Sequence, residues 1–274
     1  MYVAYGSNNV SVAQLAADGL SIVTTQPVFG YPSECNGIEG NCMYKINGTY
    51  YVLDDCPSES YTIVWKADAP LGPYTGKPFV HSVPAPIANG GTPDQGSLVQ
   101  TPDGQWYFMS FTWAYPLGRM PILTSITWGS DGYPTLETVD GAWGKSYMYP
   151  LAKYPMPSWT GVDHFNGTEL HPMWEWNHNP NSAIYAVDNG LTLYTATVTV
   201  GLFEALNSLT GRPHGPFPVG TVEIDFADMA DGDMCGLSAF RDIAGWVSMV
   251  RNGSSHTVQT CSVCHKTAAM VGSS

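Results

Sequence analysis

The chain has 274 residues, which is enough for one large β domain or two domains of ordinary size. Its formal net charge is −13 with only 10 Lys and Arg, and this excludes a nucleic-acid partner, because phosphate contacts need clustered basic residues. A 44% share of hydrophobic residues, together with 29 Gly and 21 Pro, predicts a sizeable core of short strands joined by tight turns.

The first part of the chain, residues 1–151, repeats one local pattern. Short β-rich runs alternate with turn signals, and we expect hairpins to turn at Asn47-Gly48, Asp103-Gly104 and Asp131-Gly132. The stretches "KINGTYYVL" and "QTPDGQWYFM" are near copies of each other. A hairpin repeated in this way is typical of a β-propeller blade, although a stacked sandwich gives similar local patterns.

A change of composition follows at residues 152–172, which contain three prolines and little alternation, and which we interpret as a linker. Strand patterns return in residues 173–274, among them "WEWNHNP" and "GWVSMVRNG", and predict a second β domain of sandwich type. Within it, "FEALNSLTGR" predicts about two turns of helix before Gly211.

One carboxylate stands out in "CNGIEGNC", where Glu39 follows Gly37 and precedes Gly40, between Cys35 and Cys42. Spacing alone favours an exposed loop glutamate beside two buried thiols. The alternative is a functional carboxyl group in a stiff loop, with glycines that allow close approach of a ligand.

The order of several stretches resembles glycoside hydrolase family 43: "IEG", "KINGTYYV", "APLGPYTG", then "DQGSLVQTPDGQWYFMSFTWAYPLGRMPILTSITWGSDGYP". The second half is similar to the β-sandwich of the β-xylosidase-like branch, so the resemblance covers roughly residues 1–250. It implies an all-β chain: a partial, incomplete five-bladed propeller of about three blades (1–151), the linker (152–172) and a partial β-sandwich (173–274).

The resemblance also implies a function, which is inverting hydrolysis of pentose-containing polysaccharides such as xylan, arabinan or arabinoxylan. Glu39 matches the general acid, which needs a raised pKa to stay protonated near neutral pH. A Cys35–Cys42 disulfide would then stiffen its loop. The alternative from another class is a catalytically weak or inactive carbohydrate-binding or structural remnant of the same fold.

Three further residues are candidates for substrate binding. Arg119 in "PLGR" matches an arginine that reaches the sugar in this family, and its planar fork suits paired hydroxyl contacts; a rim arginine is the alternative. Trp113 and Tyr115 are candidates for an apolar sugar platform, although aromatic residues on strands more often belong to the core.

The chain departs from the family pattern in the general base, because the family's base lies in a blade upstream of the strand with which this chain begins. Asp54, Asp55 and Asp94 are the substitutes that we can name. The family's His-Gln-Gly motif reads Asp94-Gln95-Gly96 here; Asp94 could ligate calcium in the central channel, or could mark a lost site. No cofactor is expected to be required.

Six cysteines leave the disulfide pairing open. Cys261-Ser262-Val263-Cys264-His265 has the spacing of a haem attachment site, but no zinc or haem context surrounds it. We expect a terminal disulfide instead, with Cys235 as one candidate member.

Glycosylation sequons begin at Asn9, Asn47, Asn166 and Asn252 and, with the cysteines, favour an extracellular, secreted protein, although residues 1–25 lack a signal peptide pattern. No apolar run reaches membrane-spanning length, so no membrane partner is expected. The expected partners are a pentose oligosaccharide and further copies of the chain, which would associate through exposed blade edges.

Overall fold

The computed structural model describes residues 1–93, 95–115, 117–199, 201–215 and 217–265. The chain divides into two compact units, Met1–Met156 (unit 1) and Pro157–Ser274 (unit 2), and the division falls inside the segment expected to be a linker. Among the described residues, no helix has the length and apolar character needed to cross a membrane.

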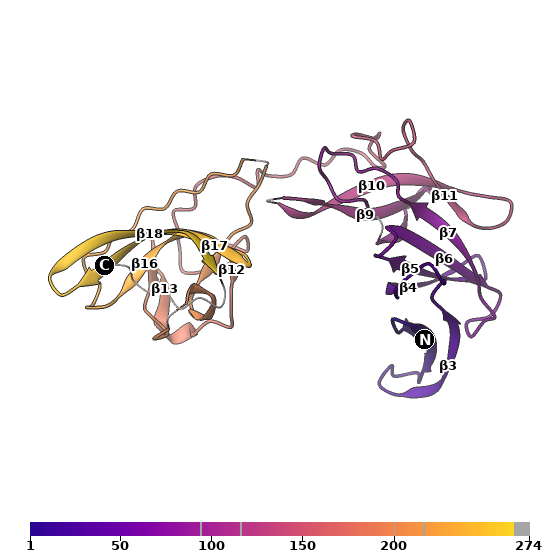
Figure 1. Cartoon of the computed structure of the whole chain (residues 1–274), viewed down its shortest axis with the longest axis horizontal. Helices are drawn as coiled ribbons and strands as arrows, with labels where there is room; N and C mark the ends of the chain where they lie inside the picture. Colours follow the sequence, from indigo (N-terminus) through magenta and orange to yellow (C-terminus); the bar gives the residue numbers. More distant parts are fainter. Residues whose placement is uncertain (94, 116, 200, 216, 266–274) are drawn as a thin grey trace. The chain divides into compact units, whose positions relative to one another are not determined.

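Unit 1 consists of three antiparallel sheets in which neighbouring strands follow one another along the chain. They confirm an all-β, partial propeller whose sheets do not close into a ring within the described part of the chain (Figure 1). The strands of the three blades are β1 (Tyr2–Tyr5), β2 (Asn9–Leu15) and β3 (Ile22–Gly30); β4 (Glu39–Ile46), β5 (Thr49–Cys56), β6 (Tyr61–Ala67) and β7 (Thr75–His81); and β8 (Gly96–Gln100), β9 (Trp106–Ala114), β10 (Gly118–Trp128) and β11 (Pro134–Leu136).

The three predicted hairpin turns are confirmed. Asn47 (φ 50°) and Gly48 (φ 89°) both adopt the left-handed conformation between β4 and β5, which matches the twist of the flanking strands. Gly104 (φ 88°) and Gly132 (φ 77°) take the same role between β8 and β9 and between β10 and β11.

The core of unit 1 lies between the blades. One face of β5 carries Tyr51 and Leu53 toward Leu98 and Phe108 of the third blade. The opposite face carries Cys56, which packs with Ile63 of β6. Val10 and partly buried Phe29 of the first blade belong to the same cluster. Because successive residues of a strand point to opposite faces, β5 contributes to both layers of the core.

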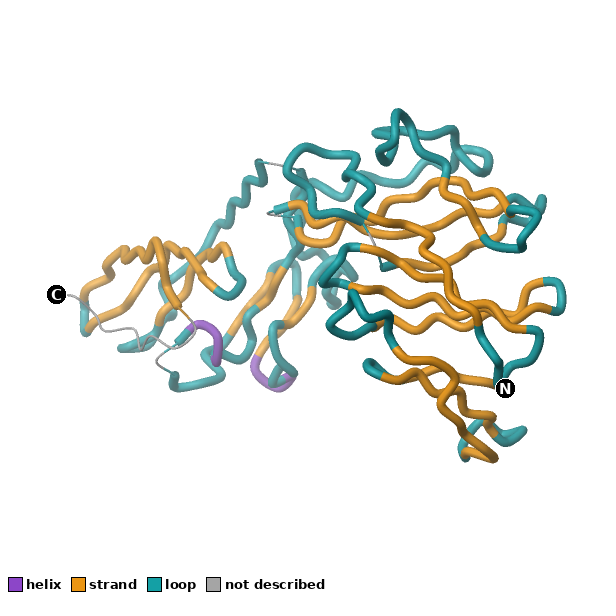
Figure 2. The backbone as a smooth tube through the Cα atoms, turned by 45° about the vertical axis from the view of Figure 1, so that its right-hand side comes forward, coloured by secondary structure: helices purple, strands orange, loops and turns teal. Residues whose placement is uncertain are grey.

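Unit 2 is built from short strands and one longer sheet, and forms the β-sandwich part of the chain (Figure 2). Its elements are β12 (Glu175–Trp176) paired with β15 (Leu209–Thr210), β13 (Tyr185–Val187) paired with β14 (Leu191–Leu193), and the sheet of β16 (Met234–Ala239), β17 (Ile243–Asn252) and β18 (Ser255–His265), with single 3-10 turns at η1 (Ser182–Ile184) and η2 (Leu202–Glu204).

The helix expected in residues 203–212 is wrong. The turn η2 ends at Glu204, and Asn207 has a left-handed backbone (φ 54°), which interrupts a right-handed helix. Leu209 and Thr210 then pair with β12, so pairing with a distant strand prevails over the local helical preference.

Candidate active site

Glu39 is the first residue of β4 and is exposed. Its partner across the ladder is Asp55, which is the last residue but one of β5 and is only 4% exposed. Directly opposite residues in antiparallel strands have Cβ atoms about 4.5–5.5 Å apart. The backbone therefore places Glu39 and Asp55 on the same face of the sheet, at the start of β4.

A β-bulge separates this pair from the rest of the ladder. The register passes from Glu39 opposite Asp55 to Cys42 opposite Leu53, which leaves one extra residue in β4. Gly40 supplies the left-handed conformation (φ 77°) that such a bulge requires, and a Cβ atom at this position would meet Gln95 Nε2 at 2.3 Å. Close packing of the Gln95 side chain is thus a second reason for glycine at position 40.

The first blade holds the bulge through two hydrogen bonds to its β1–β2 turn. The Asn41 side-chain amide donates to the Gly6 carbonyl at 2.8 Å, and the Ile38 amide donates to the Ser7 carbonyl at 2.8 Å. Sequence reasoning named Gln95 only within the Asp94-Gln95-Gly96 motif and did not identify Asn41, because the contacts that both make with neighbouring segments depend on tertiary structure.

Strands β4 and β8 run alongside each other in the same direction. Cys42 Sγ lies 3.9 Å from Ser97 Oγ, and the Leu98 amide donates to the Tyr44 hydroxyl at 3.1 Å. The start of β4 is therefore at the same end of unit 1 as the start of β8, and Glu39 lies at this end.

The predicted Cys35–Cys42 disulfide is wrong: Cys35 pairs with Cys56 and Cys42 is free. The reason is the direction of the side chains. Cys42 packs against the core shared with the third blade, whereas Cys35 and Cys56 are buried in the core shared with the first blade. The observed disulfide still fixes the Glu39 loop, because it joins the segment before β4 to the end of β5.

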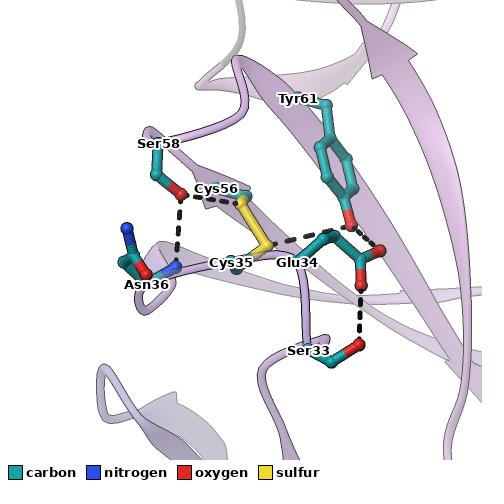
Figure 3. Close-up of a disulfide and its surroundings, with 7 residues drawn as sticks. All are labelled: Ser33, Glu34, Cys35, Asn36, Cys56, Ser58 and Tyr61. Carbon is teal, nitrogen blue, oxygen red and sulfur yellow. Dashed lines mark hydrogen bonds between the residues drawn. A yellow bond between two sulfur atoms is a disulfide. The ribbon is translucent and has the colours of Figure 1, made fainter.

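Figure 3 shows the polar groups around this disulfide. The Tyr61 hydroxyl donates to Glu34 Oε1 at 2.9 Å, and the Asn36 amide donates to Ser58 Oγ at 3.2 Å. Burial, and then the hydrogen bond to Glu34, raise the pKa of Tyr61 to about 12. Hydrogen bonds from its own backbone amide and from Tyr61 lower the pKa of Glu34, so this carboxyl group remains ionised and is a poor proton donor.

Of the two described carboxylates considered as a base, Asp55 rather than Asp54 is placed beside Glu39. Asp54 points to the other face of β5, because side chains alternate along a strand. Asp94 lies outside the described residues.

Asp54 is nevertheless an unusual group. It is 1% exposed, and neither of its carboxylate oxygens has a hydrogen-bond partner among the described residues. Burial raises its pKa to about 7, and the nearby indole N–H of Trp65 opposes the rise without reaching normal hydrogen-bond geometry. Asp54 is thus a buried acid on the face of β5 away from Glu39.

The predicted sugar-binding residues form one cluster at the β9–β10 hairpin. Arg119 stands opposite Trp113 in the ladder, and its guanidinium carbon lies 4.9 Å from the Trp113 ring centroid and 4.5 Å from that of Phe111. Tyr115 stacks on Trp113 with centroids 6.2 Å apart. Gly96 pairs with Ser110 in β9, so the hairpin tip beyond it lies at the end of unit 1 where β8 begins, which is the Glu39 end.

Three further predictions concern a metal ion, the terminal disulfide and the glycosylation sites. The described residues contain no group of three or more His, Cys, Asp or Glu that could hold a metal ion, and the calcium prediction for Asp94 stays a prediction. The expected terminal disulfide is confirmed between Cys261 and Cys264. The candidate Cys235 takes no part in it and lies in β16 beside Met229. The sequon residues Asn9, Asn47, Asn166 and Asn252 are all exposed, which glycosylation requires.

Two hollows in the surface lie away from Glu39. One of about 590 Å³ is lined by residues 149–156, and one of about 380 Å³ lies over β16 and β17. Glu39 lines neither, so we assign the candidate site from side-chain chemistry and strand register instead.

The fold and site described so far define a two-part, all-β protein with a propeller portion followed by a sandwich portion. Residues 2–134 match the family Glycosyl hydrolases family 43, and residues 162–271 match the Beta xylosidase C-terminal Concanavalin A-like domain. The chain belongs to glycoside hydrolase family 43.

Individual relatives agree with this assignment. A beta-xylosidase of Formosa agariphila is 28% identical over 55% of this chain and 29% of its own length, and a non-reducing end alpha-L-arabinofuranosidase of Bacteroides ovatus is 26% identical over 73% and 40%. An engineered GH43 glycoside hydrolase that displays both endo-xylanase and exo-arabinofuranosidase activity has a similar structure, with a TM-score of 0.86, 36% identity and coverage of 95% of this chain and 51% of that one. The chain thus spans less than half the length of these curated relatives.

Proposed function

We propose that this chain carries the proton-donating part of a glycoside hydrolase that cleaves pentose-containing polysaccharides, with xylan, arabinan or arabinoxylan as substrate classes. The observation that carries the proposal is the position of Glu39 at the start of β4, held by the bulge on one side and by the Cys35–Cys56 disulfide on the other. Names of relatives that act on xylosides and arabinofuranosides support the substrate class.

In this mechanism Glu39 donates a proton to the glycosidic oxygen as the bond to the anomeric carbon breaks. A water molecule, deprotonated by a base on the opposite face of the sugar, attacks that carbon and inverts its configuration. Buried Asp55 stands directly across the ladder from Glu39, where it would help to orient the acid. Arg119, Trp113 and Tyr115 would hold the sugar through hydroxyl contacts and ring stacking.

The second candidate is a weak or inactive carbohydrate-binding remnant, and the spacing of the carboxylates favours it. An inverting pair needs carboxyl groups about 6.5–9.5 Å apart to leave room for water. Asp55 stands directly across the ladder from Glu39, at the shorter cross-strand distance, and so fits a neighbour of the acid better than the base.

Hydrolysis of an aryl β-xyloside and an aryl α-L-arabinofuranoside tests the two candidates. We expect turnover by the wild-type chain and a loss of about 10²–10⁴-fold in Glu39→Gln, which keeps the shape but cannot donate the proton. Parallel assays with added calcium test the ion suggested for Asp94. Binding of xylo-oligosaccharides without turnover in either protein would establish the remnant instead.

We also propose that the protein is secreted and glycosylated at its four sequons. The two disulfides support this, because such bonds persist mainly in oxidising compartments. Self-association is supported by exposed apolar side chains on the outer blades, among them Val3, Tyr5, Val99 and Met109. A monodisperse monomer in light scattering would contradict the association.

A further inference from the structure

The Cys35–Cys56 disulfide takes no part in the proposed chemistry, yet it brackets the residue pair at which that chemistry begins. Cys35 lies shortly before Glu39, and Cys56 directly follows Asp55. We propose that Cys35 and Cys56 are positioning residues whose disulfide holds the Glu39 carboxyl in the geometry that proton donation needs. This inference rests on the proposed function of Glu39.

The backbone at this point needs support from outside the ladder. The bulge cuts the Glu39–Asp55 pair off from the regular pairing that begins at Cys42. Terminal pairs of a hairpin open more readily than central ones, because few hydrogen bonds must break to release them. The disulfide lies on the far side of the pair, so Glu39 and Asp55 are enclosed between the bulge and a covalent bond.

The surroundings of the disulfide are themselves rigid. Cys35 is 3% exposed and Cys56 is fully buried, in contact with a core that includes Ile38, the residue directly before Glu39. On the solvent side, the Tyr61–Glu34 hydrogen bond fixes the residue next to Cys35. A cross-link anchored in this way limits the motion of the Glu39 backbone rather than moving with it.

The second disulfide provides a matched control. Cys261 and Cys264 both belong to strand β18. They are 3 residues apart in the sequence, whereas Cys35 and Cys56 are 21 residues apart. A bond within one strand ties no second element to it. Loss of the Cys261–Cys264 bond removes a disulfide from the same protein without touching the Glu39 loop.

The test compares leaving groups of different acidity in the full chain. A good leaving group such as dinitrophenol departs without a proton, whereas a poor one such as phenol or an alkyl alcohol needs the general acid. The proteins are wild type, Cys35→Ser/Cys56→Ser and Cys261→Ser/Cys264→Ser. Both cysteines are replaced together because a remaining partner could pair with free Cys42.

We expect kcat for phenyl β-xyloside to fall about 10²-fold in Cys35→Ser/Cys56→Ser, because displacing a catalytic group by about 1 Å has an effect of this size. The kcat for the dinitrophenyl substrate should change only a few-fold, because this leaving group needs no proton. The control variant should keep the wild-type ratio. Equal losses on both substrates, or no loss, would overturn the inference, because a purely structural role affects both alike. If the serine pair does not fold, Cys35→Val/Cys56→Ala refills the buried volume and takes its place.

Amide hydrogen exchange separates this inference from the proposed function. We expect residues 36–42 to exchange faster in Cys35→Ser/Cys56→Ser than in wild type or in the control variant. Equal exchange overturns the positioning role whatever the activity. Faster exchange in the variant, together with a wild-type chain that hydrolyses neither substrate, supports the positioning role of the disulfide and rejects the proposed function. A non-reducing peptide map of the wild type must contain the Cys35–Cys56 cross-link, and its absence also overturns the inference.

Discussion

The two units differ in how much of their strand surface is buried. Among the described residues, the buried apolar side chains lie almost all in unit 1, and only Val187 and Ala244 belong to unit 2. In β16 to β18, by contrast, Leu237, Val247 and Val258 are exposed. Strand pairing alone therefore does not make a core; in unit 1, each face that buries side chains has a neighbouring blade opposite it.

The largest expected effect follows from that difference. Phe108 is fully buried and meets Phe79 edge-on with ring centroids 4.9 Å apart. Phe108→Ala should lower the free energy of unfolding of unit 1 by about 3–5 kcal/mol, because the lost burial leaves a cavity. Urea denaturation measures the shift. Val247→Ala in unit 2 is the matched control at a 47% exposed position, with an expected cost of about 0.5 kcal/mol; equal costs would contradict the comparison.

The buried carboxyl group of Asp54 should make the stability of unit 1 depend on pH. Its folded pKa of about 7 lies above the ordinary 3.8, so the unfolded chain loses this proton first as pH rises. The contribution of Asp54 to the free energy of unfolding is therefore largest below about pH 4. It falls between about pH 4 and 7, and above this range it is lower by roughly 4 kcal/mol. Asp54→Asn, which stays neutral, should remove this part of the pH dependence and stabilise unit 1 at pH 8.

Thermal unfolding between pH 4 and 8 checks this expectation. Exposed Asp228 of unit 2 offers the control, and Asp228→Asn should keep the pH dependence of the wild type. A wild-type slope that survives in Asp54→Asn would show that Asp54 is not the group responsible.

The smallest expected effect concerns turns. Gly48 has a left-handed backbone (φ 89°) in a hairpin of unit 1, and Gly48→Ala should cost about 1–2 kcal/mol because a Cβ atom disfavours this conformation. Gly161 of unit 2 has no such backbone and no neighbouring atom within 4 Å of an added Cβ, so Gly161→Ala should be neutral within about 0.5 kcal/mol. Melting temperatures compare the two, and equal shifts would show that the turn conformation is not limiting.

Local patterns predicted most of unit 1 from the sequence. The Asn47-Gly48 turn requires only its own dihedral angles, and a two-residue loop fixes the register of the flanking strands. The same reasoning failed at residues 203–212, because the pairing of Leu209 and Thr210 with β12 depends on a segment far away in the sequence.

The candidate site was predictable in part. The sequence identified Glu39 and Arg119 as candidate site residues, but sequence distance misled the assignment of the disulfide. Cys42 is the nearer cysteine to Cys35, yet its side chain lies on the other face of the sheet from Cys56. Which face a cysteine occupies depends on the bulge, and a bulge shows in sequence only as a glycine among other glycines.

The bulge has one more consequence, which concerns chain length rather than residue identity. Side chains alternate strictly along a strand, so the face on which a residue lies depends on whether an odd or even number of residues separates it from a fixed reference. The single extra residue between Glu39 and Cys42 changes this parity. The bulge absorbs this residue, so Glu39 and Cys42 keep to the same face and Glu39 stays opposite Asp55. In a related chain, deletion of one residue there would restore the regular ladder and remove the bulge, while the glutamate would remain opposite the aspartate.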